Sequence, residues 1–219
     1  MPSVVVRAYE PEDRAAVREI CHVTGYMGEP ADWFWRDRES FADMFSGYYT
    51  DREPESASVV EVNGVVSGYL LGCVDSSRAW NPGAVAGRHI VRRGIAFRRG
   101  TAGTIWRTVA DGIGALALHR QAMHELEFAD ARYPAHLHID LLPNARGMGA
   151  GGQLMRRWLG HLREKGAPGC HLQTMAENAP AIAFFTSCGF SPVGGQPRIP
   201  GFRSRTGGRL HMQTMVQSL

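Results

Sequence analysis

The segment from His136 to Leu159, HLHIDLLPNARGMGAGGQLMRRWL, restricts the possible folds more than any other part of this chain. Its first half alternates apolar and polar residues, which predicts a β-strand with one buried face. Its second half has apolar residues at helical spacing. Between the halves, four glycines fall within six residues. A strand, a glycine-rich loop and a helix in this order allow backbone to approach a ligand closely, and the free N–H groups that begin the helix favour an anion.

Two nucleotide-binding motifs compete for this loop. Gly147 to Gly152 satisfies G-x-G-x-x-G, a weak fingerprint for dinucleotides when it stands alone. A dinucleotide site also needs an acid about 20 residues further on. The strand expected there reads CHLQTM, and no acid follows it before Glu177. The lysine of a phosphate-binding P-loop is also absent from the loop. The sequence therefore argues against NAD-dependent redox chemistry and against hydrolysis of nucleoside triphosphates.

A different phosphate loop fits better. The pattern Arg146-x-x-Gly149-x-Gly151 follows a strand that ends at Pro143, and the later segment ENAPAIAFFTSCGF is a helix that begins after an asparagine and ends at Gly-Phe. This arrangement resembles the GNAT acetyltransferase superfamily. EICHVTG and GYLLGCVD, together with the segments above, are similar to bacterial relatives of the acetyltransferase-like domain of O-GlcNAcases. The resemblance covers 4–74 and 134–193.

The resemblance implies an α/β (α+β) fold, with a central mixed, mostly antiparallel sheet of about seven strands flanked by helices. The residues agree. Asn63-Gly64 predicts a tight hairpin turn, and Asn178 is a good helix N-cap. We expect strands at 3–9, 58–62, 65–74, 135–142, 169–175 and 210–217. We expect helices at 11–25, 32–49, 104–133, 151–166 and 178–189.

The chain is long enough for one domain, 1–219, in which 75–133 is an insert not typical of the family. The insert holds a cluster of arginines: Arg88, Arg92, Arg93, Arg98, Arg99 and Arg107. They could meet an anionic ligand or form a solvated face. We favour a solvated face over nucleic-acid binding for this cluster.

Composition sets further limits. The net charge of +3 is too small to indicate a nucleic-acid partner, and no apolar run approaches the roughly 20 residues that cross a bilayer. We expect no membrane partner, and the N-terminus has no signal-peptide pattern, so we expect a cytoplasmic monomer or homodimer. The four cysteines form no C-x-x-C pair, which predicts reduced thiols and no zinc site.

The resemblance implies acetyl-CoA as the cofactor. Backbone amides of the loop would hold its pyrophosphate: Arg146, Gly147, Met148, Gly149, Ala150, Gly151 and Gly152. The backbones of Leu141 and Leu142 would pair with the pantetheine arm, and one such amide would polarise the thioester carbonyl. Asn178 would bond the same arm, or cap its helix, or do both. Phe184 and Phe185 would lie beside the cofactor.

Asp140 shares a strand face with His136 and His138, and a carboxylate or imidazole there could take the proton of an incoming ammonium. His138 and Asp140 could also be a structural pair. Asp75, at the end of the hairpin strand, is a second acid expected on the acceptor side. These groups do not have the spacing of a metal site, and we expect no metal.

Two further positions bear on activity. The family usually has a tyrosine where this chain has Phe185, and it serves as general acid for the departing thiolate. Phenylalanine cannot donate a proton. Tyr26, Trp33 and Trp35 fall where the family lines its acceptor pocket, and they could equally pack as core.

The sequence thus predicts an N-acetyltransferase. It would transfer an acetyl group from acetyl-CoA to a primary amine by direct attack, the acceptor being an amino sugar, a small amine or a protein lysine. The alternative is a catalytically weak or inactive CoA-binding module that acts through a partner.

Overall fold

The computed structural model describes residues 2–117 and 126–219. Its centre is an eight-stranded sheet with the order β1-β2-β3-β4-β5-β8-β6, and β7 pairs with the far part of β8. The strands are β1 (Val4–Ala8), β2 (Ala57–Val62), β3 (Val65–Cys73), β4 (Ala135–Leu141), β5 (Gly169–Met175), β6 (Ser191–Val193), β7 (Arg198–Arg203) and β8 (Arg209–Ser218). Among the strands of the described residues, only β4 and β5 run parallel, so the predicted mixed, mostly antiparallel sheet is confirmed.

The hairpin of β2 and β3 follows directly from its turn. Asn63 and Gly64 have φ of 52° and 79°, the left-handed values that a two-residue hairpin turn needs. Neighbouring residues of β3 then point to opposite faces of the sheet. Leu71 packs among the helices of the N-terminal half, and Leu70 packs under the helix that follows the glycine loop.

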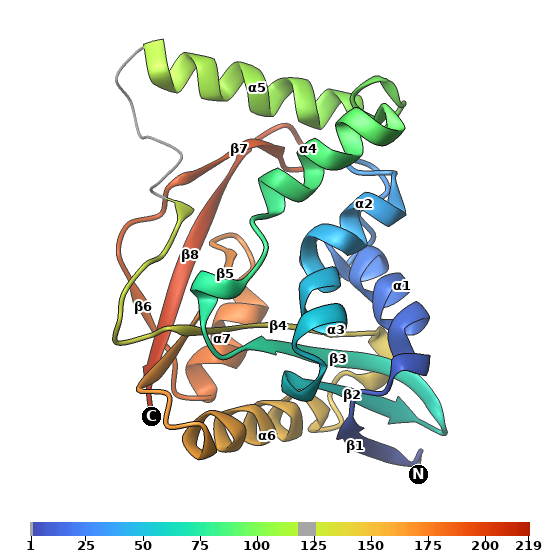
Figure 1. Cartoon of the computed structure of the whole chain (residues 1–219), viewed down its shortest axis with the longest axis vertical. Helices are drawn as coiled ribbons and strands as arrows, with labels where there is room; N and C mark the ends of the chain where they lie inside the picture. Colours follow the sequence, from blue (N-terminus) through green and yellow to red (C-terminus); the bar gives the residue numbers. More distant parts are fainter. Residues whose placement is uncertain (1, 118–125) are drawn as a thin grey trace.

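Helices cover both faces of the sheet (Figure 1). One face is covered by α1 (Arg14–Thr24), α2 (Arg38–Ala42), the π-helical turn η2 (Asp43–Gly47) and α3 (Tyr48–Arg52). The other is covered by α6 (Ala150–Glu164) and α7 (Ala179–Ser187). Within the described residues, no helix has both the length and the apolar character needed to cross a membrane.

The helix predicted over 32–49 is wrong in its extent. The chain stays irregular until Asp37, whose carboxylate accepts the N–H of Ser40 at 3.0 Å and caps α2. A π-turn at η2 then divides the helical stretch. The aromatic residues before Asp37 pack into the core without helical backbone, because burial of their rings and not helical propensity decides their position.

The insert at 75–133 forms α4 (Pro82–Arg93) and α5 (Ala102–Ala117). α5 packs against β7 along the outer edge of the molecule (Figure 1). The helix predicted over 104–133 ends at Ala117 within the described residues, its stretch 118–125 lies outside them, and 127–133 is not helical. The strand β7 was not predicted.

Candidate active site

The parallel strands β4 and β5 separate almost as soon as they meet. They share only the pairs Ala135↔Cys170 and His136↔His171. Beyond these pairs, β4 continues along β3 alone. Leu142 N–H donates to Ser67 on β3 at 2.8 Å, so strand alternation turns the N–H and C=O of Leu141 toward the gap. The Leu141 carbonyl accepts Arg146 Nε at 2.9 Å, so what the gap offers to an extended ligand at this residue is the Leu141 N–H.

The glycine loop leads from this gap into α6. Gly147 and Gly149 have φ of 73° and 75°, which favours glycine strongly. Gly149 is the N-cap of α6 and has no side chain to bond the first N–H groups of the helix. Among the described residues, no acceptor is bonded to the N–H groups of Ala150, Gly151 or Gly152. Free donors and the positive end of the helix dipole together form an anion site.

Space above the loop is open. A Cβ built on Gly147 or Gly149 meets no atom of the chain within 4 Å. One built on Gly151 lies 3.1 Å from Phe184 and 3.5 Å from Leu141. The Phe184 ring therefore extends from α7 to the start of α6, beside the gap. The residues present fit a ligand with a phosphate group and an extended arm.

The Arg146 side chain holds the start of the loop in place by two hydrogen bonds to backbone carbonyls. Its Nε donates to the Leu141 carbonyl at 2.9 Å, and its Nη2 donates to the Gly28 carbonyl at 2.7 Å. Arg146 therefore ties the end of β4 to the loop after α1, and its guanidinium is not aimed at the anion site. Sequence reasoning found the residue but not this role, because Gly28 is 118 residues away.

Asn178 caps α7, since its side-chain oxygen accepts the N–H of Ala181 at 3.3 Å. The capping role predicted for Asn178 is confirmed. Phe185 is buried in the core against Phe190, with ring centroids 6.2 Å apart. A residue at this position is thus held firmly, and in this chain it brings no proton donor.

Asp140 lies near the end of β4, on the face toward α1. Its carboxylate accepts the hydroxyl of Tyr69 at 2.6 Å, and the two residues are directly opposite in the β3–β4 register. Burial raises the pKa of Asp140 to about 7, and the Tyr69 hydrogen bond and the Arg146 charge only partly offset it. A carboxylate poised near neutrality is suited to take a proton from an amine.

The other end of the same strand face carries a hydrogen-bond chain of fixed direction. Ser76 Oγ lies 2.6 Å from both the Pro134 carbonyl and His136 Nδ1. A hydroxyl has one proton and a carbonyl only accepts, so His136 Nδ1–H must donate to Ser76. Its Nε2 then accepts the Tyr49 hydroxyl at 2.6 Å. Burial lowers the pKa of His136 to about 3, in agreement with a neutral ring.

His138 sits between these two polar groups on β4. Its ring lies 5.3 Å from that of Tyr49 and 6.4 Å from that of Phe45. Burial and the neighbouring His171 lower the pKa of His138 to about 4, so it is neutral near pH 7. A neutral imidazole can accept a proton or pass one along a water, and His138 is adjacent to Asp140 for this purpose.

The structure does not bring Asp75 to Asp140. Tyr69 is opposite Asp140, and Asp75 follows six residues later, about 20 Å along the strand direction. The Asp75 carboxylate accepts Ser77 N–H at 3.0 Å and its hydroxyl at 2.7 Å, and these bonds lower its pKa. In the structure Asp75 caps a turn. Its role in binding the acceptor stays a prediction.

The predicted aromatic cluster divides between core and surface. Trp35 is core, and its Nε1 donates to Ser40 at 2.9 Å. Tyr26 is buried against the half-buried Trp33, with ring centroids 5.0 Å apart. Arg205, from the turn between β7 and β8, lies 5.6 Å from the Trp33 ring. Sequence reasoning missed Arg205 because β7 itself was missed.

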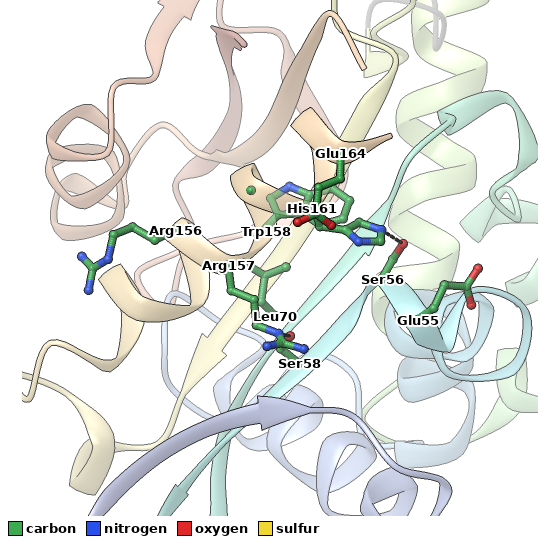
Figure 2. Close-up of a pocket in the computed structure, with 10 residues that line it drawn as sticks. Glu55, Ser56, Ser58, Leu70, Arg156, Arg157, Trp158, His161 and Glu164 are labelled. Atoms are coloured by element: carbon green, nitrogen blue, oxygen red, sulfur yellow. Dashed lines mark hydrogen bonds between the residues drawn. The ribbon is translucent and has the colours of Figure 1, made fainter. Parts of the chain in front are cut away.

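A second concavity lies on the other side of the sheet. A groove of about 440 Å³ lies between α6 and β2, with Leu70 in its lining. Figure 2 shows the side chains that line it. Arg157 donates to Ser58 at 3.0 Å, and His161 lies 3.3 Å from Ser56 Oγ. Leu70 and Tyr69 face opposite sides of the sheet, so the groove is separate from Asp140.

Comparison with known proteins matches 26–190 to the model of the "Acetyltransferase (GNAT) family". The crystal structure of a protein called SsHAT has 33% sequence identity and a TM-score of 0.70, and the match covers 99% of this chain and 98% of that one. The structure of yncA, a putative acetyltransferase from Salmonella typhimurium with its cofactor acetyl-CoA, has 20% identity, a TM-score of 0.58, and coverage of 99% and 94%. A polyamine N-acetyltransferase from Drosophila melanogaster has 16% identity, a TM-score of 0.56, and coverage of 99% and 100%.

Proposed function

Since this chain belongs to the acetyltransferase (GNAT) family and acetyl-CoA is its cofactor, we propose that it transfers the acetyl group to a primary amine by direct attack. The observation that carries the proposal is Asp140. A carboxyl with a pKa of about 7 lies at the end of a strand whose free backbone leads to an anion site. Base, gap and phosphate loop thus follow one another along one continuous segment of chain.

The residues that would hold acetyl-CoA are those of the loop and the gap. The N–H groups of Ala150, Gly151 and Gly152 would donate to the pyrophosphate, and the backbone of Leu141 would pair with the pantetheine arm. When bound, acetyl-CoA supplies an acetyl group activated as a thioester. The Leu141 N–H would donate to the carbonyl oxygen of that group, where negative charge develops during attack.

Asp140 acts as the general base in this proposal. A primary alkylamine has a pKa near 10.4 and arrives as an ammonium ion that cannot attack. Asp140 accepts one of its protons directly or through a water, and Tyr69 holds the carboxylate in place. His138, neutral and one pleat away, offers a second acceptor along the same face.

Phe185 removes the usual proton donor from the leaving-group side. The thiol of the cofactor has an ordinary pKa of about 8.5, so the thiolate departs without full protonation at neutral pH. In this proposal the rate enhancement therefore comes from proximity of the two substrates, from polarisation of the thioester carbonyl and from the general base. Binding of acetyl-CoA without thiol release for any amine would favour the module that acts through a partner.

The acceptor class rests on the similarity to the acetyltransferase-like domain of O-GlcNAcases, which suggests an amino sugar or a protein lysine. Solved relatives include one named for polyamines, so small amines belong in the same panel. In this proposal the ammonium meets the Asp140 carboxylate, and the neutral ring of His138, packed near Tyr49 and Phe45, lies two residues away on the same strand face. That setting suits one ammonium attached to an apolar or sugar body.

Ligand-dependent unfolding tests cofactor binding. Acetyl-CoA at 100 times its dissociation constant should add about 2.7 kcal/mol to the free energy of unfolding, while NAD and ATP at the same concentration add much less. Thiol release across the amine panel then tests transfer. Equal stabilisation by all three nucleotides would contradict the assignment of the loop.

The pH profile tests the base. Asp140 must be unprotonated to act, so kcat/KM should rise with pH through about 7 and level off above it. Tyr69→Phe removes a donor that stabilises the carboxylate, so the pKa of Asp140 should increase and the rising limb should move to higher pH. Activity should then fall more at pH 6 than at pH 9.

Tyr48→Phe is the matched control, because it also removes a buried tyrosine hydroxyl, one that donates to Glu53 at 3.0 Å. It should leave the position of the limb unchanged. If Tyr69→Phe lowers activity equally at every pH, the rising limb of the pH profile reports the titration of a group other than Asp140.

A further inference from the structure

One face of α5 is both apolar and exposed to solvent. Thr108 and Asp111 turn toward β7: the Thr108 hydroxyl lies 3.3 Å from the Pro200 carbonyl, and Asp111 accepts Gly201 N–H at 2.8 Å. The opposite side of the helix carries Trp106, Val109 and Ile113, which helical spacing places on one face. They are 53%, 44% and 64% exposed.

Phe97 extends this face. Its side chain is 81% exposed, and its ring centroid lies 6.3 Å from that of Trp106. We call Phe97, Trp106, Val109 and Ile113 the α5 face. Apolar side chains gathered in this way, rather than scattered singly, mark a surface that binds something.

The charge beside the α5 face has one sign. Residues 76–110 contain seven arginines and no aspartate or glutamate. Some of these arginines are used within the fold: Arg93 and Arg98 both contact Asp37 at 3.1 Å, and Arg107 donates to the Gly201 carbonyl. Arg92 and Arg99 are exposed, and Arg99 follows Phe97 by two residues. The partner should therefore be anionic where it meets the arginines and apolar where it meets the rings.

Few partners satisfy both conditions. A second copy of this chain would bring the arginine clusters of two molecules close together, and the like charges would repel. Nucleic acid would satisfy the arginines and give no apolar contact to Val109 or Ile113. A bilayer with anionic headgroups satisfies both, and α5 lies along the outer edge of the molecule (Figure 1).

We propose that the α5 face is an interfacial docking surface that holds this protein on an anionic lipid bilayer. The rings and aliphatic side chains enter the boundary between headgroups and acyl chains, and Arg92 and Arg99 contact the phosphates. This differs from the sequence-based expectation of no membrane partner, which rested on the lack of a spanning segment; in this proposal the chain lies on the bilayer and does not span it. The acceptor chemistry plays no part in this inference.

Vesicle sedimentation tests the proposal with the full chain. The protein should sediment with phosphatidylglycerol-containing vesicles and stay in solution with pure phosphatidylcholine, and added salt should weaken the binding. Phe97→Ser combined with Ile113→Ser should weaken binding about tenfold or more, because both apolar anchors are lost. Arg92→Gln and Arg99→Gln should each weaken it roughly fivefold.

Matched controls lie far from the face. Val65, in the β2–β3 hairpin, is 65% exposed, and Arg163 is exposed on α6, so Val65→Ser and Arg163→Gln make the same chemical changes elsewhere. They should leave vesicle binding unchanged. All variants alter exposed side chains, so thermal unfolding should confirm that the fold is kept.

Three results would overturn the proposal. The first is an absence of binding to either vesicle. The second is binding that the Phe97 and Ile113 changes leave intact. The third is light scattering that shows a dimer, dispersed by those two changes, with no vesicle binding; the face would then pair two copies of the chain.

Discussion

Replacing Asp140 by asparagine should lower kcat/KM by about 10²- to 10⁴-fold, the usual contribution of a positioned general base. Asparagine keeps the shape of the side chain and an oxygen that accepts the Tyr69 hydroxyl, so the fold should be kept. Acetyl-CoA binding should be unchanged, because the change lies outside the glycine loop. Steady-state kinetics with thiol detection, together with ligand-dependent unfolding, measure both effects.

Asp75→Asn is the matched control for that experiment. The sequence predicted both acids for the acceptor side, and the structure separates them by the length of β3 beyond Tyr69. Asparagine can still cap the turn at Ser77. We expect less than about a twofold change, as for an ordinary surface substitution. Equal losses in the two variants would contradict the role of Asp140, and a loss confined to His138→Gln would move the base to the imidazole.

Gly152→Glu should abolish acetyl-CoA binding while making the free protein more stable. Glutamate is a better helix former than glycine, by up to about 1 kcal/mol, and a negative charge in the first turn of α6 interacts well with the helix dipole. A Cβ at this position lies 3.4 Å from Arg156 Nη1, so the new carboxylate has a basic residue one turn along. The same charge repels a pyrophosphate at the free N–H groups.

Two variants isolate the cause. Gly152→Gln has nearly the same size without the charge, and it should keep more of the ligand-induced shift in unfolding temperature. Gly160→Glu puts the same residue later in α6, where a built Cβ meets nothing within 4 Å, and it should leave the shift intact. The opposite signs of free stability and ligand response separate blocked binding from damage to the fold. A full acetyl-CoA response in Gly152→Glu would remove the loop from the binding site.

The elements around the site could be predicted from the sequence because their signals are local. The strand GCHLQTM is β5 from Gly169 to Met175, as expected, and Asn178 and Gly189 bracket α7. The turn at Asn63-Gly64 sets the first two pairs of β2 and β3, and a bulge then shifts the register between Val60 and Glu61. In each case two or three residues with strong backbone preferences lie next to a regular apolar pattern.

The partners of the site residues could not be predicted, because they come from distant segments. Tyr69 reaches Asp140 across 71 residues, and Tyr49 reaches His136 across 87. Only the β3–β4 register and the packing of α3 bring them together. The insert was predicted poorly for a different reason. The helix α5 forms as expected through Gly112 and Gly114, but 127–133 is not helical, and the packing of α5 against β7 involves a strand with little sequence signal.

The sheet has two four-stranded parts that meet at β4 and β5. Four strands on one side and four on the other are joined by two residue pairs. The backbone amides of Ile139 and Leu141, which alternate toward the gap, should therefore exchange with deuterium much faster than those of β3. A ligand arm laid in the gap would slow that exchange on both sides at once. The amount of cofactor in the cell would then set how often the gap opens locally, and so how exposed this part of the chain is to proteases between substrates.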